Sequence, residues 1–212
     1  VTDEEYHEFY KTDFHDFTAP ARTFSIHAEG ALSYDALLFI PGRAPYDLYS
    51  KDFKKGLALY SSNVLIMEKC EELLPDHFNF VRGVVDSQDL QLNISRETLQ
   101  HNSQLRAIAK KIEKKITSEL KKMRDNDREE YEKFFENFGR GLEFGIYNSY
   151  GSLKDQLADL LLFYSAKQEK LVTLDEYLAA APADQKAIYY AAGESIERLG
   201  KMPIVKTVLG KG

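Results

Sequence analysis

The sequence has few of the features that mark secreted, membrane-spanning or repetitive proteins. Cys70 is the single cysteine among 212 residues, so no disulfide can form within the chain, and one cysteine fits a reducing compartment. No apolar run approaches the roughly 20 residues that a membrane-spanning helix needs, and the sequence contains no internal repeat or low-complexity tract. These absences predict an ordinary soluble, cytoplasmic protein with one large domain or two small ones.

The sequence also lacks the motifs of a self-contained active site. It has no Walker loop, no GxGxxG string and no GxSxG string. Its five histidines show neither an HxxxH spacing nor a Cys/His spacing typical of metal ligands. We therefore expect no structural metal and no nucleotide binding by this chain alone.

Excess positive charge is absent as well. The chain has 28 Lys and Arg against 34 Asp and Glu, a formal net charge of −6, which argues against nucleic acid or an anionic membrane as the main partner. One stretch is locally basic, and we interpret it as the solvated face of a helix rather than a site for an anionic partner. Its lysines are Lys110, Lys111, Lys114, Lys115, Lys121 and Lys122.

The first half of the chain reads as a sheet with a helix at its start. Thr2 and Glu5 have the spacing of a capping box, and alternating apolar residues followed by a glycine predict a hairpin. Pro75 predicts the end of a short helix. The predicted elements are helix Thr2–Thr12, strands Arg22–Glu29, Ser33–Pro41 and Leu57–Met67, short helix Cys70–Leu74 and strand Phe80–Asp86.

The second half is mostly helical. Apolar residues at spacings of three and four predict a long helix that packs across the sheet. A second capping box starts at Thr173. The predicted elements are helices Ser103–Arg124, Glu129–Phe138, Leu153–Ser165 and Thr173–Ala180, strand Ala187–Ala192 and helix Glu194–Leu199. The last strand has no partner strand among the remaining residues, so we expect this final part to be truncated.

The stretch Asp86–Gln100, DSQDLQLNISRETLQ, is the strongest candidate for chemistry. A strand ends here in a polar loop, and Arg96 falls on an exposed first turn of the next helix. The helix dipole favours anions at that end, so it does not explain an arginine. Two explanations are open: a salt bridge to Asp86, Asp89 or Glu97, or a contact with an anion such as a phosphate brought by another domain.

Three strings carry a resemblance to a known family. GRAPYDLY (42–49), FVRGVVDSQDLQLNISRETLQ (80–100) and IYYAAGES (188–195) together resemble the middle domain of the ninety-kilodalton heat-shock chaperones, in particular the bacterial HtpG type. The resemblance runs in order from about Glu4 to the last residues. It implies that the loop around Arg96 is a catalytic loop, in which Arg96 reaches the terminal phosphate of ATP and Gln100 assists.

The same resemblance implies a fold and a set of partners. The fold is α/β (α+β), a sheet layered with helices of the ribosomal protein S5 domain 2-like type, then a small helical layer and the start of a second small α/β unit. ATP and Mg²⁺ are held by a separate N-terminal domain. A C-terminal dimerisation domain, client proteins and co-chaperones are the other expected partners. The resemblance also implies that the full-length protein is a homodimeric ATPase, whereas the isolated segment is a monomer without activity.

Some residues depart from the family pattern. Gln91 stands where relatives usually have proline, and Asn63 where many have a basic residue, which leaves a second phosphate-facing cation in doubt. Phe17 stands where relatives often have tryptophan. We predict Phe17 and Leu65 as client contacts, with a role for Phe17 in the core as the alternative.

The predicted domain division is 1–124 for the large α/β unit with the catalytic loop, 125–168 for a helical connector and 169–212 for the truncated small unit. Two other functions are open from the residues. One is an autonomous protein-binding module that uses exposed aromatic residues. The other is the transducer domain of a type II topoisomerase, although that family typically has a lysine in a QTK-like string rather than SRETLQ.

Overall fold

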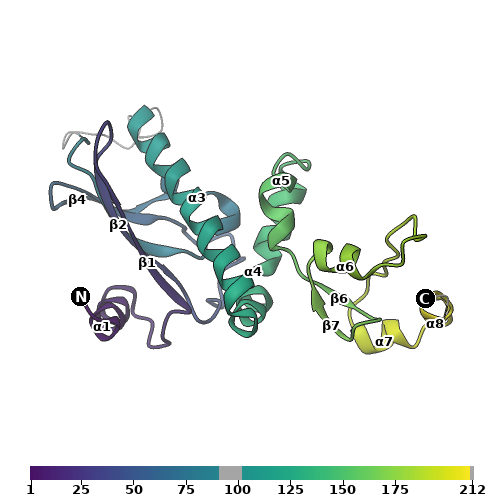
Figure 1. Ribbon diagram of the computed structural model, residues 1–212. Helices are drawn as coiled ribbons and strands as arrows, with labels where there is room; N and C mark the ends of the chain where they lie inside the picture. The colour runs from purple at the N-terminus through teal and green to yellow at the C-terminus, as the bar shows by residue number, and fades with distance from the viewer. Residues whose placement is uncertain (91–101, 211–212) are drawn as a thin grey trace. The chain divides into compact units, whose positions relative to one another are not determined.

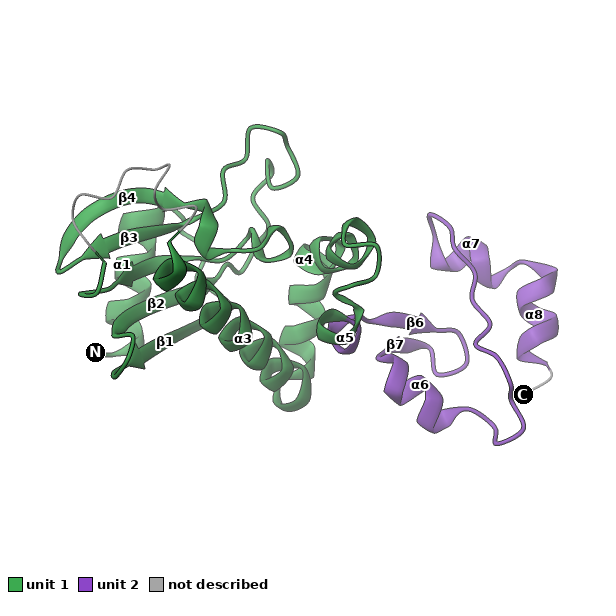
Figure 2. Ribbon diagram, turned by 90° about the horizontal axis from the view of Figure 1, so that it is seen from above, with its two compact units in different colours: residues 1–157 green, residues 158–212 purple. Residues whose placement is uncertain are grey.

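The computed structural model describes residues 1–90 and 102–210 of the chain (Figure 1). Contacts divide it into two compact units, residues 1–157 and 158–212 (Figure 2). Helix α4 therefore belongs with the sheet in the first unit, whereas the three-part division at 124 and 168 stays a prediction. Within the described residues, no helix is both long enough and apolar enough to cross a membrane.

Helix α1 (Asp3–Phe14) begins at the predicted capping box. The Glu5 amide donates to Thr2 Oγ1 at 3.3 Å, and the Thr2 amide donates to Glu5 Oε2 at 2.7 Å, which satisfies free amides of the first turn. The helix is held to the sheet by aromatic packing against Phe39, which is fully buried. The rings that contact Phe39 are those of Phe9, Tyr10 and Phe14.

The first unit is built on a five-stranded sheet with the order β1-β2-β5-β3-β4. The predicted hairpin is confirmed as an antiparallel β1–β2 pair. Strand β5 lies in the centre, antiparallel to β2 and parallel to β3. The strands are β1 (Arg22–Ala28), β2 (Tyr34–Ile40), β3 (Leu57–Ser61), β4 (Val64–Cys70) and β5 (Arg82–Asp86).

The single strand predicted at Leu57–Met67 is wrong, because the chain reverses in its middle. Ser62 and Asn63 have φ values of 48° and 65°, and they connect the antiparallel strands β3 and β4. Asparagine tolerates this left-handed conformation better than most residues do, and a two-residue turn of this kind matches the twist of a hairpin. The short helix predicted after it is a 3₁₀ turn, η1 (Glu71–Leu73), followed by a second, η2 (Asp76–Phe78).

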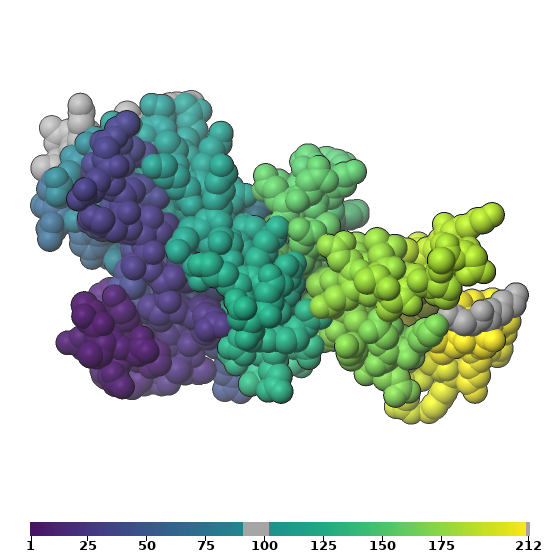
Figure 3. Space-filling model, viewed as in Figure 1, coloured from purple at the N-terminus to yellow at the C-terminus, as the bar shows by residue number. Residues whose placement is uncertain are grey.

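Helix α3 (Ser103–Asn126) confirms the predicted long helix. Its apolar stripe is fully buried and consists of Leu105, Ile108, Ile112, Ile116, Leu120 and Met123. Lys111 Nζ lies 5.9 Å from the centre of the Tyr34 ring. Because Tyr34 and Phe39 point to opposite faces of β2, α3 and α1 lie on opposite sides of the sheet. The outer side of α3 is part of the surface (Figure 3), and Lys115 and Lys122 there both pair with Glu119.

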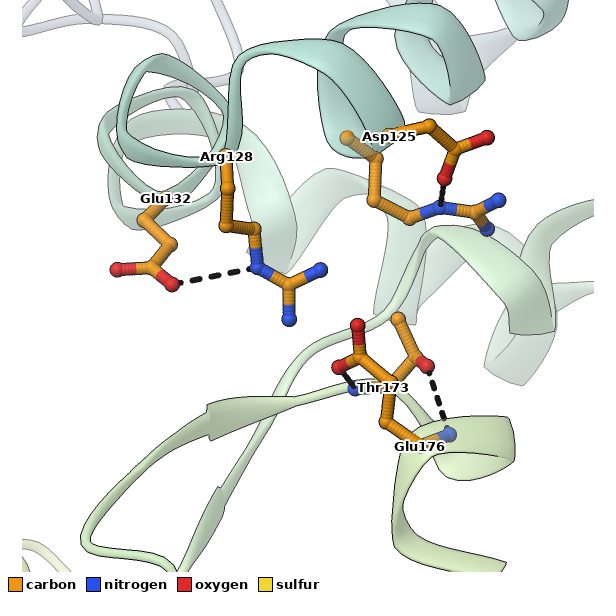
Figure 4. Close-up of polar contacts among 6 residues, drawn as sticks. Asp125, Arg128, Glu132, Thr173 and Glu176 are labelled. Atoms are coloured by element: carbon orange, nitrogen blue, oxygen red, sulfur yellow. Dashed lines mark hydrogen bonds and ion pairs between the residues drawn. The ribbon is translucent and has the colours of Figure 1, made fainter. Parts of the chain in front are cut away.

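Helix α4 (Arg128–Asn148) is longer than predicted. Its first turns include an ion pair between Arg128 Nε and Glu132 Oε1 at 3.2 Å (Figure 4). The prediction that a glycine-rich stretch ends the helix at Phe138 is wrong. Gly145 instead allows close packing, since a Cβ there would lie 2.8 Å from His77 Cβ.

The predicted helix Leu153–Ser165 is also wrong. The chain forms only the short α5 (Lys154–Leu157) and the 3₁₀ turn η3 (Ala158–Leu160) before it enters a strand. Leu157 and Leu160 are fully buried, so these turns are fixed by packing rather than by helix length.

The second unit contains a small hairpin, β6 (Phe163–Ser165) and β7 (Lys170–Val172). Helix α6 (Leu174–Ala180) comes next, and its predicted capping box is confirmed by contacts between Thr173 and Glu176 (Figure 4). The strand predicted at 187–192 is wrong. These residues are exposed and lie outside regular structure, because β6 pairs only with β7 and no described strand faces them. Helices α7 (Ile196–Gly200) and α8 (Pro203–Leu209) complete the unit.

Candidate functional site

The predicted catalytic residues Arg96 and Gln100, together with Gln91, lie outside the described residues. The structure describes the framework on either side of them. The chain leaves the sheet at the end of β5, continues as far as Leu90, and is described again from Asn102, the N-cap of α3. Two flanks therefore frame the candidate site, and we call them the loop base (Asp86–Leu90) and the α3 cap (Asn102).

The loop base begins where β5 leaves the sheet. Asp86 Oδ2 accepts a hydrogen bond from the Asn63 amide at 2.9 Å. The amide of the next residue, Ser87, donates to the Tyr60 carbonyl at 3.1 Å. Both bonds go to the end of the β3–β4 hairpin, so this hairpin and the loop base share one hydrogen-bonded junction.

The end of the loop base is buried. Ser61 Oγ donates to the Leu90 carbonyl at 2.6 Å, and the exposed fractions of these two residues are 1% and 3%. Inside the protein, such a bond satisfies a carbonyl that water cannot reach. The path of the chain is thus fixed up to the last residue described before the loop.

The β1–β2 connection supports the loop base from another side. Ser87 Oγ donates to the Ser33 carbonyl at 2.8 Å, and the Ser33 amide donates to Asp89 Oδ2 at 2.6 Å. Asp89 thus binds a backbone amide, and its carboxylate contributes to holding the loop base in shape.

The α3 cap fixes the other flank. Asn102 Oδ1 accepts a hydrogen bond from the Leu105 amide at 3.0 Å, which satisfies one of the amides left free at a helix start. Leu105 is fully buried, on the side of α3 that faces the sheet. The two flanks are therefore held by the same core, one through β5 and the other through α3.

The charge beside the loop base is mixed. Asp35 is the register partner of Asp86 across β2 and β5, and Asp35 Oδ1 lies 2.5 Å from His27 Nδ1. Hydrogen bonds to Asp35 and then Glu29 raise the pKa of His27, because they favour the charged imidazolium. A hollow of about 290 Å³ lies on this part of the sheet, and Leu37 and Val84 are among the residues that line it.

The described residues offer no metal centre. Across residues 1–90 and 102–210, no group of three or more His, Cys, Asp or Glu side chains is arranged to hold a metal ion. Cys70 is buried at the end of β4, and burial together with Glu72 raises the pKa of its thiol to about 12. This thiol therefore stays protonated and unreactive near neutral pH.

Both predicted client contacts lie on the surface of the first unit. Phe17 has 85% of its side chain exposed, in the segment between α1 and β1, so the alternative of a core role is wrong. Leu65 is 46% exposed on β4, beside Val64 at 53%. Exposure of large apolar side chains is a requirement for client contact, but their function stays a prediction.

One surface feature escaped the sequence analysis. The guanidinium carbon of Arg140 lies 5.7 Å from the Tyr49 ring centre and 5.4 Å from that of Phe144. The three residues come from α4 and from the segment after β2. Tyr49 and Arg140 are 91 residues apart in the sequence, so no local sequence pattern predicts that they are in contact.

Comparison with known families gives a match to the Hsp90 protein family over residues 1–212. The chain belongs to the Hsp90 protein family. Chaperone protein HtpG of Bacillus subtilis is 55% identical to this Hsp90 chain over 212 residues, which are 100% of the chain and 34% of the relative. Chaperone protein HtpG of Clostridium acetobutylicum is 56% identical over 209 residues, 99% of the chain and 34% of the relative.

A solved structure shows which part of an Hsp90 protein this is. The middle domain of a heat shock protein of Plasmodium falciparum matches with a TM-score of 0.84 and 28% sequence identity, covering 100% of this chain and 82% of that chain. The chain therefore has the fold of an Hsp90 middle domain and spans about a third of the length of the curated relatives that it matches. Membership of this family favours the chaperone interpretation over a topoisomerase transducer domain.

Proposed function

We propose that this chain is the middle segment of an ATP-dependent chaperone and that it supplies Arg96 to ATP held by a separate N-terminal domain. The observation that supports the proposal most is the framework of the loop. Its two flanks are fixed on one core, by the Ser61–Leu90 hydrogen bond on one side and by the Asn102 cap on the other. Both ends of the loop are therefore attached to this unit.

The chemistry proposed for Arg96 is stabilisation of charge on the terminal phosphate. Transfer of a phosphoryl group to water builds up charge on the phosphate oxygens, and an arginine that arrives from a second domain can stabilise that charge through its planar donor group. Mg²⁺ and the nucleotide belong to the N-terminal domain in this proposal. Movement of the middle segment towards that domain would deliver the guanidinium and so couple hydrolysis to closure.

Gln100 is proposed to assist at the same junction, by orienting the loop or the phosphate. The remaining parts of the proposal concern the whole protein: a C-terminal domain that makes a homodimer, co-chaperones, a cytoplasmic location, and client proteins that contact Phe17 and Leu65. Broad surfaces with exposed apolar side chains suit partly folded clients better than one deep pocket does. Neither nucleic acid nor a membrane is proposed as a partner.

The test is Arg96→Ala in the full-length protein. We expect ATP turnover to fall at least tenfold with little change in ATP affinity, since arginines delivered in this way typically raise turnover by roughly 10³ to 10⁵. Arg96→Lys should restore only part of the rate, because lysine is a point charge without the planar fork. Arg198→Ala, which removes an exposed arginine of α7, is the control. Normal hydrolysis by Arg96→Ala would assign Arg96 to a surface salt bridge instead.

A further inference from the structure

Arg140 is an exposed residue of α4 whose guanidinium lies over two aromatic rings. Its guanidinium carbon is 5.7 Å from the Tyr49 ring centre and 5.4 Å from that of Phe144. Both aromatic residues are partly exposed, at 48% and 42%. The negative face of an aromatic ring attracts a cation at such distances, so the two rings hold the guanidinium in place at the surface. We call Tyr49, Arg140 and Phe144 the Arg140 cluster.

The N–H groups of this guanidinium have no acceptor in the described structure. Glu136 and Glu143 stand four residues before and three residues after Arg140, which are the spacings at which helical side chains form ion pairs. Within residues 1–90 and 102–210, neither glutamate pairs with Arg140, and its guanidinium makes no other hydrogen bond or ion pair. The planar fork of donors is therefore available to an acceptor from outside.

The segment that carries Tyr49 is fixed against α4. The Ala44 amide donates to Asn137 Oδ1 on α4 at 3.0 Å. Asn79 Nδ2 donates to the carbonyl of Leu48, which is buried, at 3.4 Å. These contacts hold the chain on both sides of Tyr46 and up to Tyr49. A surface that is already arranged before binding loses less conformational freedom when a partner binds.

Aromatic side chains continue from Arg140 along the same side of α4. Phe144 and Tyr147 follow it by four and seven residues, and they are 42% and 77% exposed. This side of the helix thus presents one cation next to apolar rings. Glu136 and Glu143 add negative charge on either side of Arg140. A singly charged carboxylate with an apolar neighbour therefore fits this surface better than a multiply charged phosphate does.

We propose that the Arg140 cluster is a docking surface for a segment of a partner protein that carries a glutamate or an aspartate beside an apolar side chain. The carboxylate accepts hydrogen bonds from the guanidinium fork, and the apolar side chain packs on Phe144 and Tyr147. This inference does not depend on the role proposed for Arg96. It also concerns a different part of the chain from Phe17 and Leu65, the residues proposed for client contact.

The experiment is an NMR titration of the 212-residue chain with two blocked pentapeptides. Both have leucines beside a central residue, which is glutamate in one peptide and glutamine in the other. The glutamate peptide should bind about tenfold more tightly, because hydrogen bonds between charged groups contribute more than those that involve a neutral acceptor. Its addition should shift the Arg140 Nε–H signal together with the ring signals of Tyr49 and Phe144.

Variants of the cluster separate the charge from the rings. Arg140→Gln should abolish the preference for the glutamate peptide, whereas Arg140→Lys should keep part of it, since lysine lacks the planar fork. Phe144→Ala should weaken both peptides by a similar factor. Arg198→Gln is the matched control, because it removes an exposed arginine from α7 and should leave both affinities unchanged. If Arg140→Gln fails to fold, the comparison of the two peptides on the unchanged chain and on Arg140→Lys decides.

Four results would overturn the proposal. The first is equal affinity of the two peptides for the unchanged chain, and the second is an unchanged preference in Arg140→Gln. In the third, inorganic phosphate displaces the glutamate peptide at equal concentration, which would assign the Arg140 cluster to phosphate groups. In the fourth, the Arg140 signals change with the concentration of the chain alone, which would assign the cluster to a contact between two copies of this chain.

Discussion

Gly83 lies on β5, three residues before Asp86, at a position where the backbone of β2 leaves no room for a side chain. Its φ is +153°, and a Cβ built there would lie 2.2 Å from the Leu37 carbonyl oxygen and 3.0 Å from Leu38 Cα. Both atoms belong to the backbone of β2, which pairs with β5 in register. A side chain at position 83 must therefore push two central strands apart, so Gly83→Ala tests the energetic weight of this close approach between β2 and β5.

The expected magnitude has two contributions. A residue other than glycine in this backbone region costs roughly 1–3 kcal/mol, and forcing extra volume into a packed core costs a further 1–3 kcal/mol or so. We therefore expect Gly83→Ala to lower the free energy of unfolding of the first unit by about 4 kcal/mol. Gly30→Ala is the matched control, because Gly30 has a φ of +122° but no atom within 4 Å of its built Cβ. Its loss should be about 1–2 kcal/mol.

The assay is urea unfolding of the 212-residue chain, with hydrogen exchange in β2 and β5 as the probe so that the first unit is followed separately. For a urea m-value of ~2 kcal/mol/M, the two variants should differ by about 1–1.5 M in midpoint. Equal destabilisation by Gly83→Ala and Gly30→Ala would show that the close approach of β2 and β5 has no energetic weight, and this reasoning would then be wrong.

Two further predictions concern the surface of the first unit. The pKa of His27 is raised in the folded protein, so its interactions with Asp35 and Glu29 contribute their full stability at pH values below the usual histidine pKa near 6.5. This stability is lost as the pH rises through the pKa of folded His27. An NMR titration should show a midpoint above 6.5 that falls in Asp35→Asn, and an unchanged midpoint in that variant would refute the assignment. Phe17 is 85% exposed. Phe17→Ala in the full-length protein should therefore reduce the protection of client proteins from aggregation, while the basal ATPase rate and the unfolding midpoint stay the same. Loss of folding would contradict the exposed position.

Elements governed by local rules could be predicted from the sequence. The Thr2 and Thr173 capping boxes and the 24-residue helix α3 follow from spacings within one or two helical turns. The β1–β2 hairpin follows from alternation on both sides of a turn. In each case the residues that decide the structure lie close together along the chain.

Elements governed by distant contacts could not be predicted. Gly145 is compatible with the last turn of α4 because His77, far away in sequence, packs against it. Residues 187–192 have the composition of a strand, but a strand forms only where another strand offers its backbone groups. The long apolar run from Leu57 concealed a reversal at Ser62 and Asn63, since apolar residues continue on both sides of this turn.

That concealed reversal matters most for the candidate site. If 57–67 were one straight strand, Ser61 would lie in its middle, next to the polar residues Ser62 and Asn63, with no reason to approach the loop base. Because the strand ends at Ser61, its hydroxyl is placed at the end of β3 beside Leu90, 29 residues further along the chain. The string around Arg96 carries the family resemblance, whereas the hydrogen bond that holds the loop base at Leu90 depends on a turn that the string does not contain.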